Sequence, residues 1–439
     1  MKRDSEPVRA KANTGLGVPP STPRGDLSLS GAPLGRGPGA LVGEEAVRPP
    51  ELPDQEASAL RALSNAPAAE GGPTQRRASE TLPPGAGDED TLSRLAVVVA
   101  EAGVEANGCE GGLLDTIECD LERIEAALAS LAQEAEHHQE AAAHLLTSGG
   151  KRIRPTCVLL AAALGGVAGV TSRGKRARDF ALAAELVHQA TLLHDDVLDL
   201  GTTRRGKPCA RLVYGNAASI YGGDWLLARA LTTVLDGGDN TVLRSLLGTI
   251  ETMVDAEVLQ LKTKGTFRTT MADYECIALG KTAALFRWAL EAGAAAGGLE
   301  AAAQQALGRL GDSLGLAFQM VDDILDVVGD AAVTGKKRAS DLREGKLAYP
   351  LVKALSEQVI EAGEIASIAE ALSSGDAQEG LDALDRLGQR CVENGIIDRC
   401  RADVTALTSH ALAELEYVPA VPARALLADI ITVSARREA

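Results

Sequence analysis

Residues 192–199 read Leu-Leu-His-Asp-Asp-Val-Leu-Asp, and residues 320–327 repeat the pattern as Met-Val-Asp-Asp-Ile-Leu-Asp-Val. On a helix, the first and last aspartates of each stretch lie one turn apart on one face: Asp195 with Asp199, and Asp322 with Asp326. Carboxylates placed this way repel each other, and their apolar neighbours are residues that proteins normally bury. We therefore interpret the stretches as two facing helices that hold Mg²⁺, which binds a few carboxylates and completes its shell with water and phosphate oxygens. The alternative, two solvated acidic faces, is adequate for one copy of the pattern but does not explain two.

The sequence around these stretches predicts an all-α fold. From about residue 91 onward the chain is rich in Ala, Leu, Glu and Arg and shows no sustained strand alternation. We expect residues 91–439 to form one large helical domain. The longest apolar run, Cys157 to Val170, covers 14 residues and includes two glycines. It is too short to span a membrane, so we expect no transmembrane segment.

Residues 1–90 differ in composition from the rest of the chain. They hold 13 of the 18 prolines, and no aromatic residue precedes Phe180. Such a segment has little with which to build a core, so we predict a disordered tail. It lacks the apolar stretch of a secretory signal and carries acids that a transit peptide avoids. A start site further along the chain is an alternative, because Met1 is the only methionine before Met253.

Charge and cysteine content limit the class of protein. The net charge of −17 argues against nucleic acid as a partner, which would require a basic groove. The seven cysteines are odd in number and include no Cys-x-x-Cys pair. We interpret them as reduced and predict a cytoplasmic location.

Basic residues gather at two places near the first acidic stretch. Ser148–Pro155 forms a corner between two helical patterns, in which Lys151 and Arg154 could converge on one phosphate group. Arg152 is expected to be solvated. Gly201–Pro208 follows the aspartates and carries two arginines, Arg204 and Arg205. These arginines could bind phosphate or simply pair with the aspartates.

Other polar residues fit the same interpretation. His188 lies seven residues before Asp195, on nearly the same helix face, and could donate to a phosphate; a core histidine bonded to a carbonyl is the alternative. In the second half the candidates are Lys281, Thr282, Gln319, Lys336 and Lys346. Aspartates, cations and an amide in this combination suit the binding of two diphosphates and the ionisation of one.

These motifs, in this order, resemble the trans-isoprenyl diphosphate synthase (polyprenyl synthetase) family over about residues 120–439. The resemblance is carried by GGKRIRP, LLHDDVLD with RRGKP, GNAASIYGGDWLLARA, EVLQL, GKTAALF, GLAFQMVDDILD and TGKKRASDLREGKLAYP. It implies an all-α bundle around a deep central cavity, usually a homodimer, that condenses isopentenyl diphosphate with an allylic diphosphate. It also implies roughly three Mg²⁺ ions per active site.

The resemblance assigns roles to individual residues. The direct Mg²⁺ ligands would be Asp195, Asp199 and Asp322, supported by Asp196, Asp323 and Asp326. Isopentenyl diphosphate would be bound by Lys151, Arg154, His188 and Arg205. The allylic diphosphate would be held by Arg204, Lys281, Thr282, Gln319, Lys336 and Lys346, with Lys281 also counted as catalytic. Ala348 and Ala339 depart from the family's usual Thr and Gly, but neither change removes a charge.

Product length is predicted from the residues four and five positions before Asp195. A bulky aromatic residue there would close the cavity in which the prenyl tail grows, whereas this chain has Thr191 and Ala190. Small side chains leave room for a growing tail, so we expect a long-chain all-trans product of roughly C30 to C50. A shorter geranylgeranyl or geranylfarnesyl product remains an alternative, because a deeper obstruction cannot be located from sequence.

Two rival functions are weaker. A class I terpene cyclase shares the helical fold, but its second metal motif normally contains Asn, Ser and Glu, and this chain has a second Asp-rich motif. A non-catalytic subunit would be expected to lack one acidic stretch or the arginines, and all are present.

Overall fold

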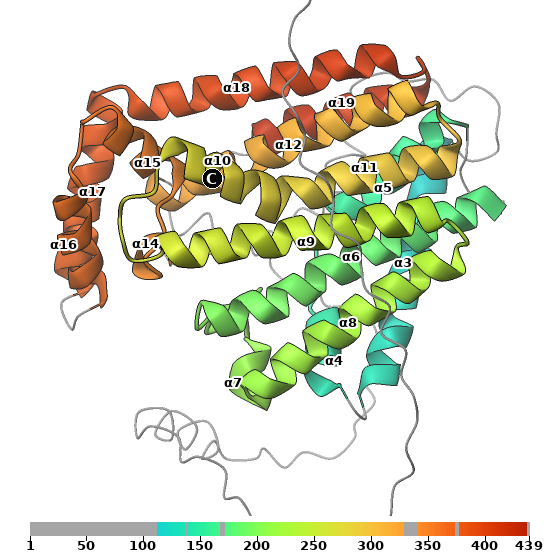
Figure 1. The fold of residues 1–439 in the computed structure, drawn as a ribbon, viewed down its shortest axis with the longest axis horizontal. Coiled ribbons are helices and arrows are strands. Elements are labelled where there is room, and N and C mark those ends of the chain that lie inside the picture. Colours follow the sequence, from blue (N-terminus) through green and yellow to red (C-terminus); the bar gives the residue numbers. More distant parts are fainter. Residues whose placement is uncertain (1–111, 137–138, 167–171, 329–339, 374–376, 437–439) are drawn as a thin grey trace, which may run out of the picture. The chain divides into compact units, whose positions relative to one another are not determined.

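The computed structural model describes residues 112–136, 139–166, 172–328, 340–373 and 377–436. The predicted tail, residues 1–90, and its boundary with the helical domain lie outside these residues. Within them the all-α prediction is confirmed (Figure 1). The longer helices are α3 (Leu113–Ala135), α5 (Ile153–Leu164), α6 (Ser172–Leu198), α8 (Asn216–Asp236), α9 (Asn240–Thr263), α11 (Ala284–Gly297), α12 (Ala301–Val328), α16 (Ala362–Ser373), α17 (Ala377–Glu393), α18 (Ile396–Glu414) and α19 (Pro422–Ala435). Shorter ones are α4 (Glu140–Leu146), α7 (Ala210–Tyr214), α10 (Met271–Ala278), α14 (Ser340–Arg343), α15 (Tyr349–Ser356), the π-helix η1 (Leu279–Ala283) and the 3₁₀ turn η2 (Leu415–Tyr417).

A short hairpin interrupts the helices. Strands β1 (Thr203–Arg204) and β2 (Lys207–Pro208) pair antiparallel around Arg205 and Gly206, whose φ angles are 50° and 74°. Positive φ at both central positions is typical of the tight turns that match strand twist. The hairpin therefore holds the two arginines in an ordered loop directly after the first acidic stretch.

Glycines let the central helices approach closely. A Cβ placed on Gly293 of α11 would lie 2.2 Å from the carbonyl oxygen of Val158 in α5. A Cβ on Gly315 of α12 would lie 2.4 Å from Cα of Ala283 in η1. No larger side chain fits at such separations, so backbone packs against backbone. Helix α11 and the adjoining η1 are thus fixed between α5 and α12.

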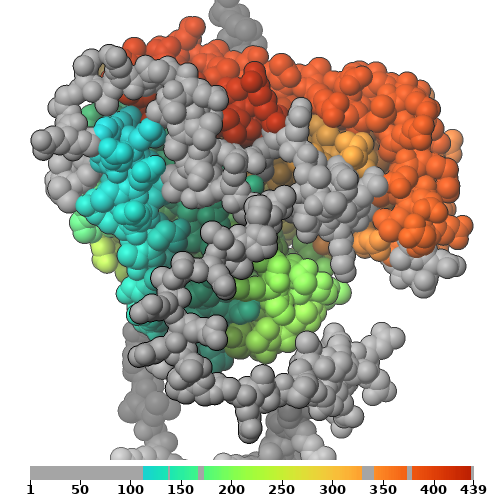
Figure 2. Space-filling view, turned by 180° about the vertical axis from the view of Figure 1, so that it is seen from behind, coloured from blue at the N-terminus to red at the C-terminus, as the bar shows by residue number. Residues whose placement is uncertain are grey.

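Two hydrophobic clusters stabilise the helical domain. One joins α3, α5, α6, α8 and α11 and contains Phe180 and Trp288, which are almost fully buried and meet edge to face at 6.4 Å. The other joins the C-terminal part of α12 to α15–α18 and contains Met320 and Ile324. Helix α12 contributes to both. In the view from behind, the C-terminal helices (orange) and the segment near residues 200–220 (green) share one face (Figure 2).

The acidic stretches lie at the C-terminal ends of two long helices, since α6 ends at Leu198 and α12 at Val328. The C-terminal end of a helix carries partial negative charge, so acidic side chains there are unfavourable unless cations are close. Positive charge close to either helix end would therefore be stabilising. Among the helices that the structure describes, none combines the length and apolar character needed to cross a bilayer.

Candidate active site

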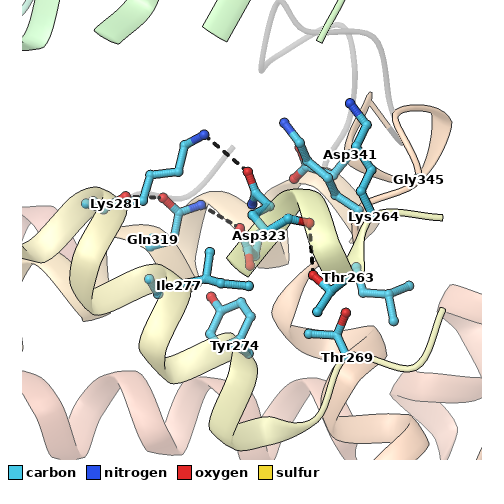
Figure 3. A pocket seen from close by; sticks show the side chains of 15 residues that line it. Thr263, Lys264, Thr269, Tyr274, Ile277, Lys281, Gln319, Asp323, Asp341 and Gly345 are labelled. Carbon is cyan, nitrogen blue, oxygen red and sulfur yellow. Dashed lines mark hydrogen bonds between the residues drawn. The ribbon is translucent and has the colours of Figure 1, made fainter. Parts of the chain in front are cut away.

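A polar pocket of about 120 Å³ lies between the end of α9, the α10–η1 segment, α12 and residues 341–347 (Figure 3). Its lining includes three lysines, Lys264, Lys281 and Lys346, together with the polar side chains of Thr282, Gln319 and Asp323. Figure 3 shows Lys264 and Lys281 extending toward the same side of the pocket, beyond Gln319 and Asp323. Three ammonium groups around one small space favour a multiply charged anion.

The lysines of this pocket contact the first acidic stretch. The Nζ atom of Lys281 lies 3.3 Å from Oδ2 of Asp195, and that of Lys264 lies 3.1 Å from Oδ1 of Asp199. Lys346 Nζ lies 2.5 Å from the other oxygen of Asp199. Burial alone would raise the pKa of Asp199, but Lys346, Lys281 and Lys264 together lower it below its ordinary value. The lysines therefore stabilise the ionised form of Asp199, and both aspartates have an ammonium group against an oxygen.

The π-helix η1 brings Lys281 and Thr282 to the pocket. The Thr282 hydroxyl donates to Oε1 of Gln319 at 2.8 Å, which orients the amide of Gln319. A π-turn inserts a residue into a helix and redirects its side chains, and such turns are frequent at functional sites. This local change of pitch aims consecutive residues, Lys281 and Thr282, at one pocket, as the sequence analysis expected.

Asp323 belongs to the second acidic stretch but is almost fully buried. Its carboxylate accepts hydrogen bonds from Nε2 of Gln319 and from the backbone N–H of Tyr349, both at 2.8 Å. Tyr349 is the first residue of α15, and Ala348, at the N-cap, offers no side-chain acceptor. Asp323 therefore caps α15 from a neighbouring helix and holds Gln319. Asp322 and Asp326 in the same stretch are partly exposed.

Asp196 and Arg204 form a pair in this structure. Arg204 donates to Oδ1 of Asp196 from Nε at 3.0 Å and from Nη2 at 2.8 Å. Asp196 is almost fully buried, so the pairing satisfies a carboxylate that has left water. Of the two interpretations left open for Arg204, the structure shows the ion pair.

A second basic pocket, of about 510 Å³, lies on the Ser148–Arg154 corner and is also lined by Glu185, His188, Arg205 and Phe318. The Arg154 guanidinium stands 4.5 Å above the ring of Phe286, and its buried Nε has no hydrogen-bond partner among the described residues. Burial lowers the pKa of His188 well below its ordinary value, and the nearby arginines lower it further. His188 is thus neutral beside a cluster of cations, and the pocket suits a second anion.

Arg152 differs from its expected solvated position. It adopts a left-handed backbone conformation, with φ of 50°, and is only 8% exposed. Its guanidinium pairs with Glu125 and with the buried Glu185, each at 2.5 Å. Arg152 therefore anchors the basic corner to α3 and α6, and it lines the pocket together with Lys151 and Arg154.

The candidate chain-length residues lie next to each other on α6. Ala190 is fully buried, and Thr191 is partly buried with its hydroxyl donating to the backbone oxygen of His188 at 2.8 Å. That bond turns the polar group of Thr191 back onto the helix. Small side chains therefore occupy both positions one turn before Asp195 on α6. The remaining candidate, Lys336, lies outside the described residues.

Comparison with known proteins identifies the family. The model of the polyprenyl synthetase family matches residues 135–382. Component 2 of a heptaprenyl diphosphate synthase from Geobacillus stearothermophilus is 34% identical over 68% of this chain and 89% of its own. An all-trans-nonaprenyl-diphosphate synthase (geranyl-diphosphate specific) from Rhodobacter capsulatus is also 34% identical, over 67% of this chain and 87% of its own.

A solved structure supports the same family. The polyprenyl synthase of Caulobacter crescentus, in complex with calcium and isoprenyl diphosphate, superposes with a TM-score of 0.66 at 31% identity over 81% of this chain and all of its own.

The chain belongs to the polyprenyl synthetase family.

Membership makes this protein a prenyltransferase that acts on isoprenoid diphosphates. The synthase contains polar residues in or beside the first pocket that have no role in the predictions from sequence. Glu257 of α9 forms a short ion pair with Lys281, and Gln260 accepts from the same ammonium at 3.2 Å. Both residues belong to the EVLQL motif, which contributes to the family resemblance but to which no role in binding is assigned from the sequence. Lys264 belongs to none of the motifs.

The donor set of the synthase fits a divalent cation. No group of three His, Cys, Asp or Glu side chains among the described residues converges closely enough to enclose a metal by itself. Mg²⁺ does not need such a cage, because it usually retains water and binds substrate phosphates beside one or two carboxylates. Asp195 and Asp199 offer such carboxylates, and positive charge already stands against their oxygens in the form of lysine ammonium groups.

Proposed function

We propose that this synthase condenses isopentenyl diphosphate head to tail with an allylic diphosphate in a Mg²⁺-dependent reaction, and that its product is a long-chain all-trans polyprenyl diphosphate. One observation carries the proposal: the two basic pockets each suit one diphosphate, and acidic helix ends lie beside one of them. Two separate anion sites agree with a reaction between two diphosphates.

The pockets would divide the substrates between them. The lysine-lined pocket would take the allylic diphosphate, with Thr282 and Gln319 as additional polar contacts. The corner pocket would take isopentenyl diphosphate, with Lys151, Arg154 and Arg205 as cations and neutral His188 as a donor. Arg204 would remain on Asp196 and contribute positive charge from there.

The chain's own residues explain how the reaction is favoured. When the allylic C–O bond breaks, negative charge develops on the departing diphosphate, and the lysines are already in place to stabilise it. The double bond of isopentenyl diphosphate then attacks the allylic cation, and a proton is lost to the departing diphosphate. Mg²⁺ held by Asp195, Asp199 and Asp322 would add further neutralising charge, with roughly three ions per site.

The long product agrees with two features. No aromatic residue stands at positions 190 and 191, and Ala183 and Ala184, about two turns earlier on α6, are also small. Several relatives, including those from Geobacillus and Rhodobacter, are named for heptaprenyl and nonaprenyl products. Replacing Ala190 by Phe should place a bulky ring beside the growing tail and shorten the product.

We also propose that the synthase is a homodimer that associates through α8 and α9. These consecutive helices carry exposed apolar side chains at helical spacing. A soluble monomer rarely exposes such a set of apolar side chains. On α8 they are Ile220, Tyr221 and Leu235, and on α9 Leu247, Val254, Val258 and Leu261; each is between 42% and 65% exposed. Figure 1 shows α8 and α9 joined by a short turn at one end.

The test of association compares two valines. Val254 on α9 is 55% exposed and Val392 on α17 is 52% exposed, so Glu at either position burdens the folded monomer equally. Sedimentation should show that Val254→Glu converts dimers to monomers whereas Val392→Glu does not. Monomeric wild type, or equal behaviour of the two variants, would reject the interface.

The test of the activity is direct. The purified protein is incubated with Mg²⁺, labelled isopentenyl diphosphate and either farnesyl or geranylgeranyl diphosphate, and the dephosphorylated products are sized. Products of roughly C30 to C50 are expected, because no large side chain stands at the two control positions. Products that stop at C20 or C25 would reject the long-chain assignment but retain the reaction, and cyclic hydrocarbons would favour a terpene cyclase.

A further inference from the structure

Lys264 is a cation of the first pocket that no sequence motif identifies. It is the residue immediately after α9, and its ammonium contacts Oδ1 of Asp199 at 3.1 Å and the backbone oxygen of Leu198 at 3.4 Å. Its side chain is 26% exposed, so it is neither buried in the core nor free in solvent. It also lines the pocket with Lys281 and Lys346.

The backbone holds Lys264 close to Lys346. The N–H of Gly265, the residue after Lys264, donates to the carbonyl oxygen of Gly345, the residue before Lys346, at 2.8 Å. Both glycines have positive φ, and a Cβ on Gly345 would lie 3.0 Å from the nitrogen of Gly265. Two segments about 80 residues apart are thus joined by a contact that glycine permits. The contact places two ammonium groups on the same carboxylate.

Three lysine ammonium groups contact two carboxylates of the first acidic stretch. Lys264 and Lys346 share Asp199, and Lys281 contacts Asp195. A divalent cation at these carboxylates would repel the ammonium groups, since like charges a few ångströms apart are unfavourable. The released ammonium groups would still border the pocket, where a diphosphate offers a stronger partner than one carboxylate.

Lys281 and Lys346 each pair with a second carboxylate close by. Lys281 also pairs with Glu257, and Lys346 also pairs with Glu344 at 2.9 Å. Among the residues that the structure describes, Asp199 is the one carboxylate that Lys264 contacts. Lys264 is therefore the lysine whose partner changes most completely when a cation occupies Asp199.

We propose that Lys264 is a further lysine of the allylic diphosphate site, and that it exchanges Asp199 for the diphosphate when a divalent cation binds. The inference rests on the proposed function. In the absence of metal Lys264 competes with the cation for Asp199; in its presence Lys264 binds the diphosphate. One side chain thus weakens the binding of metal alone and strengthens the binding of the second ligand, which makes the two events cooperative.

This proposal predicts effects of opposite sign for one variant. Lys264→Met should bind Mg²⁺ alone more tightly, on the order of fivefold. The cation no longer has to displace the attraction between Lys264 and Asp199, and two unit charges about 4 Å apart interact by about 1 kcal/mol in a water-like dielectric. The same variant should bind pyrophosphate in the presence of saturating Mg²⁺ at least about tenfold more weakly, through loss of a charged hydrogen bond. Lys264→Arg should restore much of the pyrophosphate affinity. A side chain with a purely structural role would not shift the two affinities in opposite directions.

The experiment uses calorimetry on the full chain, first with Mg²⁺ alone and then with inorganic pyrophosphate at saturating Mg²⁺. Lys262→Met is the matched control, because Lys262 is an exposed lysine two residues earlier on α9 and does not line the pocket. Melting temperatures establish that each variant is folded. Unchanged affinities, or affinities that move in the same direction, would overturn the role of Lys264. Failure of the wild type to bind pyrophosphate with Mg²⁺ would instead reject the proposed function.

Discussion

Replacing Gly315 by alanine should disturb the candidate active site without touching any residue that lines it. Gly315 lies on α12 one turn before Gln319, and a Cβ there would stand 2.4 Å from Cα and 2.7 Å from Cβ of Ala283. Ordinary carbon–carbon contacts are about 3.5–4.0 Å, so α12 and η1 must separate by about 1 Å. Because the facing atoms include backbone, no change of rotamer can relieve the contact.

Two opposing free energies set the size of the effect. Overpacking in a tight interface typically costs about 1–3 kcal/mol. Alanine is favoured over glycine inside a helix by roughly 0.5–1 kcal/mol, which offsets part of that cost. We expect the free energy of unfolding of Gly315→Ala to fall by about 1–2 kcal/mol relative to wild type. The separation should also lengthen the 2.8 Å bond from Thr282 to Gln319 and raise the KM for the allylic diphosphate.

Urea denaturation measures the first effect and steady-state kinetics the second. Gly248→Ala on α9 is the matched control, because a Cβ at Gly248 meets nothing within 4 Å. The control should gain roughly 0.5–1 kcal/mol from helix propensity alone and leave the KM unchanged. If Gly315→Ala proved as stable as Gly248→Ala, the inference that backbone contact fixes η1 against α12 would be wrong.

Three further predictions concern buried polar groups. The pKa of His188 is lowered in the folded protein, so between that lowered pKa and about 6.5 the unfolded chain binds more protons than the folded chain. The free energy of unfolding should therefore fall by up to about 1.4 kcal/mol per pH unit below 6.5. In urea titrations, His188→Gln should lose less free energy of unfolding between pH 7.5 and pH 5.5 than the wild type does. Glu185→Leu should cost roughly 3–5 kcal/mol in urea denaturation, because it removes a partner of the buried Arg152; stability equal to wild type would contradict that pairing. Asp323→Ala should lower the free energy of unfolding by about 1–3 kcal/mol, since it leaves the N–H of Tyr349 without its acceptor, and increased hydrogen exchange at the start of α15 would report that loss.

Much of the fold and part of the site could be predicted from local patterns. Helical periodicity predicts the all-α class, and the first aspartate stretch is a place where positive charge gathers, since three lysines contact Asp195 and Asp199. Lys281, Thr282 and Gln319 lie in one pocket as expected, because each belongs to a motif with fixed spacing. The prediction of a solvated Arg152 is wrong, because its burial depends on Glu125 and Glu185, which come from other helices.

The sequence by itself determined which elements form and which residues carry charge, because helix periodicity, glycine positions and motif spacing are properties of short stretches. Only the tertiary structure decided which charges meet. Lys264 and Asp199 are far apart in the chain, yet their atoms stand 3.1 Å apart because the Gly265–Gly345 contact and the packing of α9 bring them together. Asp323 and Tyr349 illustrate the same point, since a carboxylate from a metal-like motif caps a separate helix. Such pairings depend on the relative placement of whole helices, which packing of the core sets and no local pattern encodes.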